Sequence, residues 1–129
     1  MKYFFDNCVS YRLAHMLSAV EVNAIALRDV IPANTGDLDL FDYLANNKPI
    51  ALVSTDKSQL RKEVEMRKLK SIKVTAVYIE PFWTKKLILW SQAEWMVKNW
   101  PTIESWVESS VTGSFGSVKQ RGRIESIRI

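Results

Sequence analysis

The chain has 129 residues and 47% hydrophobic residues, which suits one compact domain and leaves no room for a second full domain. Its apolar runs fall far short of the ~20 residues that cross a bilayer, and early polar residues argue against a secretory leader. The lone cysteine cannot form an internal disulfide. We therefore expect a cytoplasmic protein without a membrane anchor. The formal net charge of +4 is compatible with a polyanionic partner but does not by itself indicate one.

The first eighty residues alternate short apolar runs with helical patterns. Strands are expected at residues 2–5, 24–27, 50–55 and 73–79, and helices at residues 9–20, 37–46 and 58–70. Alternation of this kind predicts an α/β fold, a three-layer sandwich with a mainly parallel central sheet.

The remaining residues follow a different pattern. From Trp83 to Ser109 apolar residues recur every three or four positions, which predicts C-terminal helices, a kinked pair in which Asn99 caps a second helix begun by Pro101. Four of the five tryptophans are expected on the inner face, where they pack in the core or against another subunit, so a homodimer is plausible. We therefore expect a domain over residues 1–110 and a basic tail over residues 111–129, either an edge strand or a mobile arm.

Three aspartates occupy positions where an α/β fold usually places its chemistry. Asp6 and Asp56 close two apolar runs that read as parallel strands, and Asp37 opens a helical pattern. The carboxyl ends of parallel strands form the edge where open α/β sheets bind ligands. We therefore expect the three carboxylates to lie at one edge of the sheet.

Two interpretations of these aspartates remain open. Carboxylates that converge in a partly buried cleft repel one another unless a cation compensates, and oxygen ligands favour Mg²⁺ or Mn²⁺. Alternatively, each aspartate only caps a helix or a turn. The single histidine excludes a histidine-rich zinc site.

Cations follow the third aspartate and recur near the end of the chain. Lys57 and Arg61 come directly after Asp56, and Arg121 and Arg123 lie in the basic tail. Such clusters are most often solvated surface, but their placement beside a carboxylate cleft makes these four residues candidates for contact with the phosphates of RNA. The apolar residues of the tail favour a role in assembly over a free RNA-binding arm.

The order of these motifs resembles that of the PIN-like nucleases, and within them the branch of VapC-type toxins. The matching segments are Phe5-Asp6-Asn7 with the helix start through Ala14, Ala26-Leu27-Arg28-Asp29, Thr35-Gly36-Asp37, and Ser54-Thr55-Asp56. Each motif is short, but the four occur in the family's order over about residues 1–80.

This resemblance implies a metal-dependent endoribonuclease, the toxin of a toxin–antitoxin pair, in which Asp6, Asp37 and Asp56 hold Mg²⁺ or Mn²⁺ and cleavage leaves a 5′-phosphate. Many relatives carry a fourth acid where this chain has Ser58, and Asp39 or Glu63 is a candidate substitute. Asn7, Ser54 and Ser58 are further accessory candidates. The segment after Ile79 has no counterpart in the family and is a candidate surface for a second copy or for the cognate antitoxin.

Two other functions are compatible with the sequence. The missing fourth acid favours a non-catalytic PIN-like module that binds RNA or protein. A phosphoaccepting receiver domain would also place an aspartate such as Asp56 after a central strand, but it needs an acidic pair after strand one and a lysine after a fifth strand. Asp6-Asn7 supplies only half of that pair.

Overall fold

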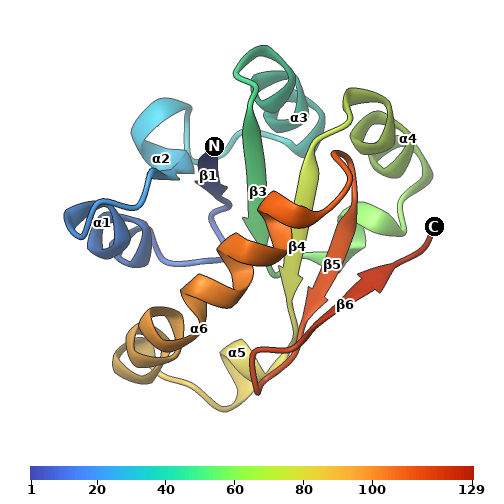
Figure 1. The fold of residues 1–129 in the computed structure, drawn as a ribbon. Helices are drawn as coiled ribbons and strands as arrows, with labels where there is room; N and C mark the ends of the chain where they lie inside the picture. The colour runs from blue at the N-terminus through green and yellow to red at the C-terminus, as the bar shows by residue number, and fades with distance from the viewer.

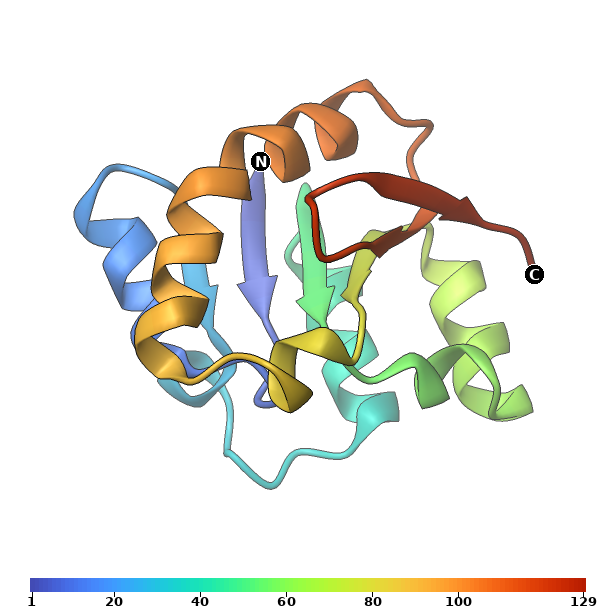
Figure 2. The same ribbon diagram turned by 90° about the horizontal axis from the view of Figure 1, so that it is seen from below.

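A computed structural model describes all residues, 1–129, as one six-stranded sheet with helices on both faces (Figures 1 and 2). The elements are β1 (Lys2–Phe5), α1 (Tyr11–Ala19), β2 (Ala24–Ala26), α2 (Leu27–Val30), α3 (Asp37–Asn46), β3 (Ile50–Ser54), the 3₁₀ helix η1 (Lys57–Leu60), α4 (Glu63–Ile72), β4 (Thr75–Ile79), α5 (Phe82–Lys85), α6 (Leu89–Ser109), β5 (Phe115–Val118) and β6 (Ile124–Ile127). The predicted α/β three-layer architecture is confirmed.

The strands lie in the order β2-β1-β3-β4-β5-β6, and all neighbours are parallel except β5 and β6. The strands β3, β4 and β5 are buried along their whole length, as expected of a parallel sheet covered on both faces. The carboxyl ends of β1, β3, β4 and β5 therefore meet at one edge, which we call the carboxyl edge.

Alternate residues of each strand face two separate cores. Tyr3 and Phe5 face the layer formed by α1, α5 and α6, whereas Phe4 faces the layer formed by α3 and α4. The period of two along β1 thus divides its aromatic side chains between the cores. Each helical layer packs its apolar stripe against one face, and the sheet is fixed from both sides.

The long helix α6 corrects the predicted pair of helices. One helix runs from Leu89 to Ser109 with Pro101 inside it, and the side chain of Asn99 donates to the Trp95 carbonyl at 2.9 Å instead of capping a new helix. Pro101 has no N–H for the Val97 carbonyl, but Val97 is 58% exposed and lies on the solvent side. The carbonyl is therefore on the side where solvent can reach it, and Figure 2 shows the axis of α6 turning between its two halves.

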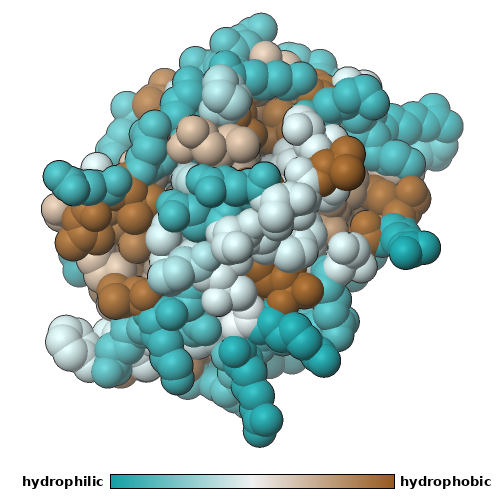
Figure 3. All heavy atoms as spheres, viewed as in Figure 1, coloured by the Kyte–Doolittle hydropathy of each residue, from teal (hydrophilic) through white to brown (hydrophobic).

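Four tryptophans pack inward, which is the predicted number, but the recurring apolar positions predicted Trp90 among them and not Trp95. Trp83 and Trp100 are buried and Trp95 and Trp106 pack against the same core, while Trp90 is 73% exposed. Trp90 shares the helical spacing of the others but lies on the outer side of α6. Hydrophilic side chains cover most of the face seen in Figure 3, with apolar groups between them.

The segment predicted as a basic tail completes the sheet. The strand β5 pairs in parallel with β4, and β6 returns antiparallel to form the edge. Of the two alternatives, the edge strand is therefore the one observed, and residues 1–110 and 111–129 share one sheet. Arg123, directly before β6, and Glu125 within it place charges at this exposed edge, which discourages pairing with another sheet edge.

Two other boundaries differ from the predicted elements. The predicted helix 58–70 is divided into η1 and α4, since Asp56 caps a short 3₁₀ turn before α4 begins at Glu63. The residues Arg28 and Asp29 form the short α2 instead of ending a strand. None of the helices is both long and apolar enough to span a membrane.

Close packing at Gly116 predicts a large effect of a small substitution. A Cβ at this position in β5 would lie 2.8 Å from the side chains of both Ile124 and Trp106. We expect Gly116→Ala to lower the free energy of unfolding by about 1–3 kcal/mol, measured by urea denaturation. At Gly36 a Cβ meets nothing within 4 Å, so Gly36→Ala should change stability by less than about 0.5 kcal/mol; equal effects would contradict this packing.

Candidate active site

Parallel pairing places polar residues side by side at the carboxyl edge. Asp6 directly follows β1, Ser54 ends β3 and Asp56 lies two residues further. β1 and β3 are neighbours, with Phe5 opposite Val53, and the Asp6 N–H donates to the Val53 carbonyl at 3.0 Å. Asp37 reaches the same edge from the first turn of α3.

The Asp6 carboxylate is the most buried acidic group of this edge, with 8% of the residue exposed. Its Oδ1 accepts from the Asn7 backbone N–H at 2.8 Å, and its Oδ2 accepts from Ser54 Oγ at 2.9 Å and from Gln59 Nε2 at 3.1 Å. All three donors are neutral. Neither Asp6 nor Asp37 nor Asp56 forms an ion pair with a lysine, arginine or histidine.

Gln59 connects Asp6 with Asp37. Its Nε2 donates to Asp37 Oδ1 at 3.1 Å as well as to Asp6, and its Oε1 accepts from the Tyr78 hydroxyl at 3.0 Å. Tyr78 and Gln59 are both fully buried. The hydroxyl therefore fixes the orientation of the amide, with its donor group between the two carboxylates.

The electrostatic consequence is visible in the pKa of two groups. Burial raises the pKa of Asp6, and the charge of Asp37 raises it further, while the hydrogen bonds from Ser54, Asn7 and Gln59 oppose the shift. Burial also raises the pKa of Tyr78, with added contributions from the neighbouring aspartates. The site holds negative charge that no protein cation compensates.

Asp56 lies at the predicted edge, but its side chain is hydrogen-bonded to Ser58 and not linked to the other two acids. Its Oδ1 accepts from the backbone N–H of Ser58 at 3.1 Å and from the Ser58 hydroxyl at 2.5 Å, as the N-cap of η1. Its backbone N–H donates to Ser54 Oγ at 3.1 Å, and Ser54 in turn donates to Asp6. The capping interpretation thus describes the side chain of Asp56.

The accessory candidates take up different positions. Asn7 donates to the Ala33 carbonyl at 2.5 Å and so holds the loop that leads to Asp37. Asp39 is exposed in the first turn of α3, and Glu63 pairs with Arg67 at the start of α4. Neither acid is hydrogen-bonded to Asp6 or Asp37. No three side chains among histidine, cysteine, aspartate and glutamate lie close enough together to hold a metal ion.

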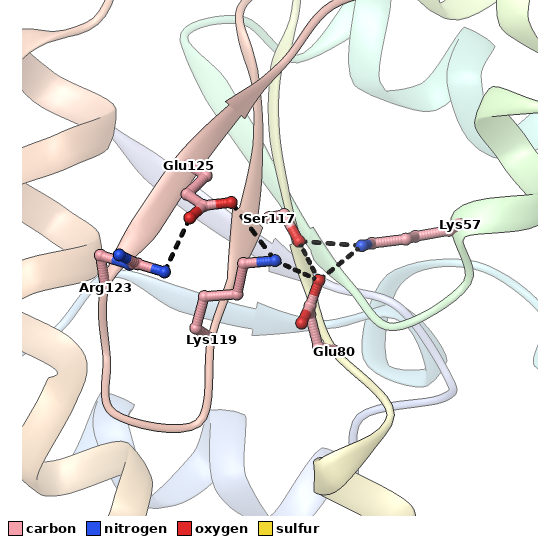
Figure 4. A network of polar contacts seen from close by, with 6 residues as sticks. All are labelled: Lys57, Glu80, Ser117, Lys119, Arg123 and Glu125. Carbon is pink, nitrogen blue, oxygen red and sulfur yellow. Dashed lines mark hydrogen bonds and ion pairs between the residues drawn. The ribbon is translucent and has the colours of Figure 1, made fainter.

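An acid that the sequence analysis missed lies further along the edge. Glu80 follows β4 as Asp6 follows β1, so the signal that identified Asp6 was present in the sequence. One oxygen of Glu80 accepts from Lys57 Nζ at 3.0 Å, Ser117 Oγ at 2.7 Å and Lys119 Nζ at 2.8 Å (Figure 4). The hydrogen bond from Lys119, supported by Ser117 and Lys57, lowers the pKa of Glu80 to about 2.

The four predicted RNA-contacting cations divide into two groups. Lys57 is engaged by Glu80, and Arg123 pairs with Glu125 at 2.8 Å. Arg61 and Arg121 are exposed and form no ion pair. Exposed guanidinium groups therefore lie near both ends of the Lys57–Glu80–Lys119 network.

One requirement of a receiver domain is met, and another is not. Lys119 follows the fifth strand, but its Nζ lies 2.8 Å from Glu80 and 3.4 Å from Glu125 and forms no ion pair with Asp56. Asp6-Asn7 still supplies only one acid after β1.

The network around Glu80 predicts a pH-dependent contribution to stability. Its folded pKa of about 2 lies below the ordinary 4.5, so the contribution is complete above pH 4.5 and is lost as the pH falls toward 2. At pH 7, Glu80→Gln should lower the free energy of unfolding by about 1–2 kcal/mol, measured by urea denaturation.

The control is Glu108→Gln, which removes an exposed carboxylate that forms no ion pair. It should leave stability nearly unchanged. A difference between wild type and Glu80→Gln that persisted undiminished near pH 2 would contradict the assignment of this network.

Comparison with known proteins identifies the family of the chain. A family model described as a PIN like domain matches residues 1–81, which include β1 to β4 and the acids Asp6, Asp37 and Asp56. No curated protein and no solved structure matches the chain. The family match covers more than half of the 129 residues, and the chain belongs to the PIN-like domain family.

Proposed function

We propose that this protein is a metal-dependent endoribonuclease and the toxin of a toxin–antitoxin pair. The observation that carries the proposal is the buried Asp6 carboxylate, joined to Asp37 through one amide nitrogen and compensated by no cation. The PIN-like family often includes nucleases. Asp6 and Asp37 lie at the carboxyl edge, where the resemblance to nuclease motifs predicts the catalytic acids.

The available side chains suit a hard divalent cation. Asp6 and Asp37 present carboxylate oxygens, which favour Mg²⁺ or Mn²⁺ over softer metals. When bound, such an ion activates water and stabilises the charge that develops on a phosphate. Asp6 and Asp37 would hold it, and Asp56, which caps η1 in this structure, would join them only after its side chain leaves Ser58.

The neutral residues of the site orient these ligands. Ser54 and the Asn7 backbone hold both oxygens of Asp6, so its carboxylate keeps one rotamer. Tyr78 fixes Gln59, which in turn positions Asp37 against Asp6. Support of this kind sharpens the geometry of a catalytic group.

An exposed apolar surface supports the partner half of the proposal. Trp90 is 73% and Val97 58% exposed on the outer side of α6, and they line a groove of about 430 Å³ with Met16 and Ala93. Large exposed apolar side chains of this kind are characteristic of interaction surfaces. An antitoxin, or a second copy of the chain, is the partner that we propose for it.

A non-catalytic PIN-like binding module is the second candidate. The side chain of Asp56 is occupied by Ser58, which stands at the position of the usual fourth acid. Only Asp6 and Asp37 are connected, through Gln59, and with two acids the chain would bind RNA or protein without cutting it. The two candidates differ in metal binding and in cleavage.

Substituting Asp6 tests the nuclease directly. We expect Asp6→Asn to lose RNA cleavage by at least about 100-fold, since it removes the buried charge while keeping the shape. Cleavage of a labelled RNA with Mg²⁺ or Mn²⁺ measures this, and EDTA should stop it. The matched control is Asp39→Asn, which removes an exposed charge from the same edge region and should retain cleavage. A wild-type rate in Asp6→Asn would refute the assignment.

Metal-dependent stabilisation separates the two candidates without a cleavage assay. A ligand that binds only the folded state raises its melting temperature, so Mg²⁺ or Mn²⁺ should raise that of the wild type by several degrees. Asp6→Asn should show little response, while Asp39→Asn should respond like the wild type. Equal responses of all three proteins, without RNA cleavage, would favour the non-catalytic module.

A further inference from the structure

The turn between β5 and β6 forms one wall of a strongly basic cavity. The cavity has a volume of about 900 Å³ and is lined by Lys98, Lys119, Gln120, Arg121 and Arg123, which we call the hairpin cradle. No apolar residue lines it. Four of its five side chains are cations, so its chemistry suits a multiply charged anion.

The backbone of the hairpin cradle is fixed before any ligand arrives. The Lys119 N–H donates to the Arg123 carbonyl at 2.8 Å, and the Gly122 N–H donates to the Lys119 carbonyl at 2.9 Å. Gly122 has a φ of 89°, and a Cβ there would lie 2.2 Å from Asn99 Oδ1. The turn therefore rests directly on α6.

A second contact fastens the same turn to α6. Trp95 Nε1 donates to the Gln120 carbonyl at 2.7 Å. The cations of the cradle thus project from two elements that are locked together, which reduces the entropy lost when they bind an anion.

The cradle retains positive charge after its internal pairs are counted. Lys119 is shared between Glu80 and Glu125, and Arg123 is paired with Glu125 (Figure 4). Lys98 and Arg121 form no ion pair or side-chain hydrogen bond. Figure 3 shows hydrophilic side chains projecting from the end of the molecule where Figure 1 places the turn.

The position of the cradle relates it to the acidic site. The β5–β6 turn follows the carboxyl end of β5, which is separated from β1 by β3 and β4. Three strand spacings correspond to about 15 Å. Lys57, Glu80 and Lys119 form a continuous polar chain over the part of this distance from the end of β3 to the end of β5.

We propose that the hairpin cradle binds a backbone phosphate of the RNA strand, a few nucleotides from the bond held at Asp6 and Asp37. This inference rests on the proposed function and adds the direction in which the strand crosses the carboxyl edge. Arg121 supplies a planar guanidinium that matches two phosphate oxygens, and Lys98 adds a point charge.

The test compares two double variants that each remove two positive charges. Lys98→Ala/Arg121→Ala empties the cradle of its unpaired cations. Lys70→Ala/Arg128→Ala is the matched control, because Lys70 and Arg128 line a second basic cavity, of about 510 Å³, beside the start of β5 at the opposite edge. All four side chains are exposed, so both variants should melt like the wild type.

Binding to a fluorescent single-stranded RNA is measured by anisotropy at several salt concentrations, in EDTA so that no cleavage occurs. The slope of log affinity against log salt should fall by about 0.7 for each phosphate that the cradle variant no longer neutralises, and the control should keep the wild-type slope.

Equal salt slopes in both variants would refute phosphate binding by the cradle. Residues 111–129 would then serve assembly or only solubility. Cleavage with Mg²⁺ or Mn²⁺ is measured separately. If the wild type cuts RNA and the cradle variant has the wild-type salt slope, only the proposed role of the cradle is refuted. If the salt slope of the cradle variant is lower but the wild type does not cut RNA, the phosphate-binding role of the cradle is supported and the proposed nuclease activity is refuted.

Discussion

The buried carboxylate of Asp6 imposes the constraint on which the carboxyl edge depends. A carboxylate withdrawn from water needs hydrogen bonds to both oxygens, and here they come from the backbone of Asn7, from Ser54 at the end of β3 and from Gln59 in η1. Each of these donors reaches the carboxylate only if the strand or helix that carries it lies in the right register with β1. Satisfying one group therefore fixes the arrangement of several elements around it, including Asp37 through Gln59.

Much of this arrangement is predictable from sequence. The helix expected at residues 37–46 has those bounds, and Asp6, Asp37 and Asp56 reach the predicted edge. These predictions succeed because alternating apolar runs determine strand positions, and parallel pairing then determines where the strands end. Glu80 followed the same rule and could have been identified with it.

Other features follow from three-dimensional contacts that no local pattern records. Gln59 belongs to an ordinary polar stretch, and only the fold places it between two carboxylates under the Tyr78 hydroxyl. A proline normally begins or breaks a helix, but α6 continues through Pro101 because apolar residues before and after it pack against the same core. The basic tail became a hairpin because β4 offered a free edge that local composition does not reveal.

The order of the strands in the chain has a consequence for folding. Val77 of β4 pairs with Gly116 of β5, and the whole of α6 lies between them in sequence. Closing so long a loop costs entropy before the two strands can pair, which slows the pairing of distant parallel strands. The acids lie within residues 1–81, whereas Lys119 arrives with β5. A chain in which β5 has not yet paired would thus have Glu80 and Lys57 at the carboxyl edge but would lack Lys119, and Glu80 would have one cationic partner instead of two.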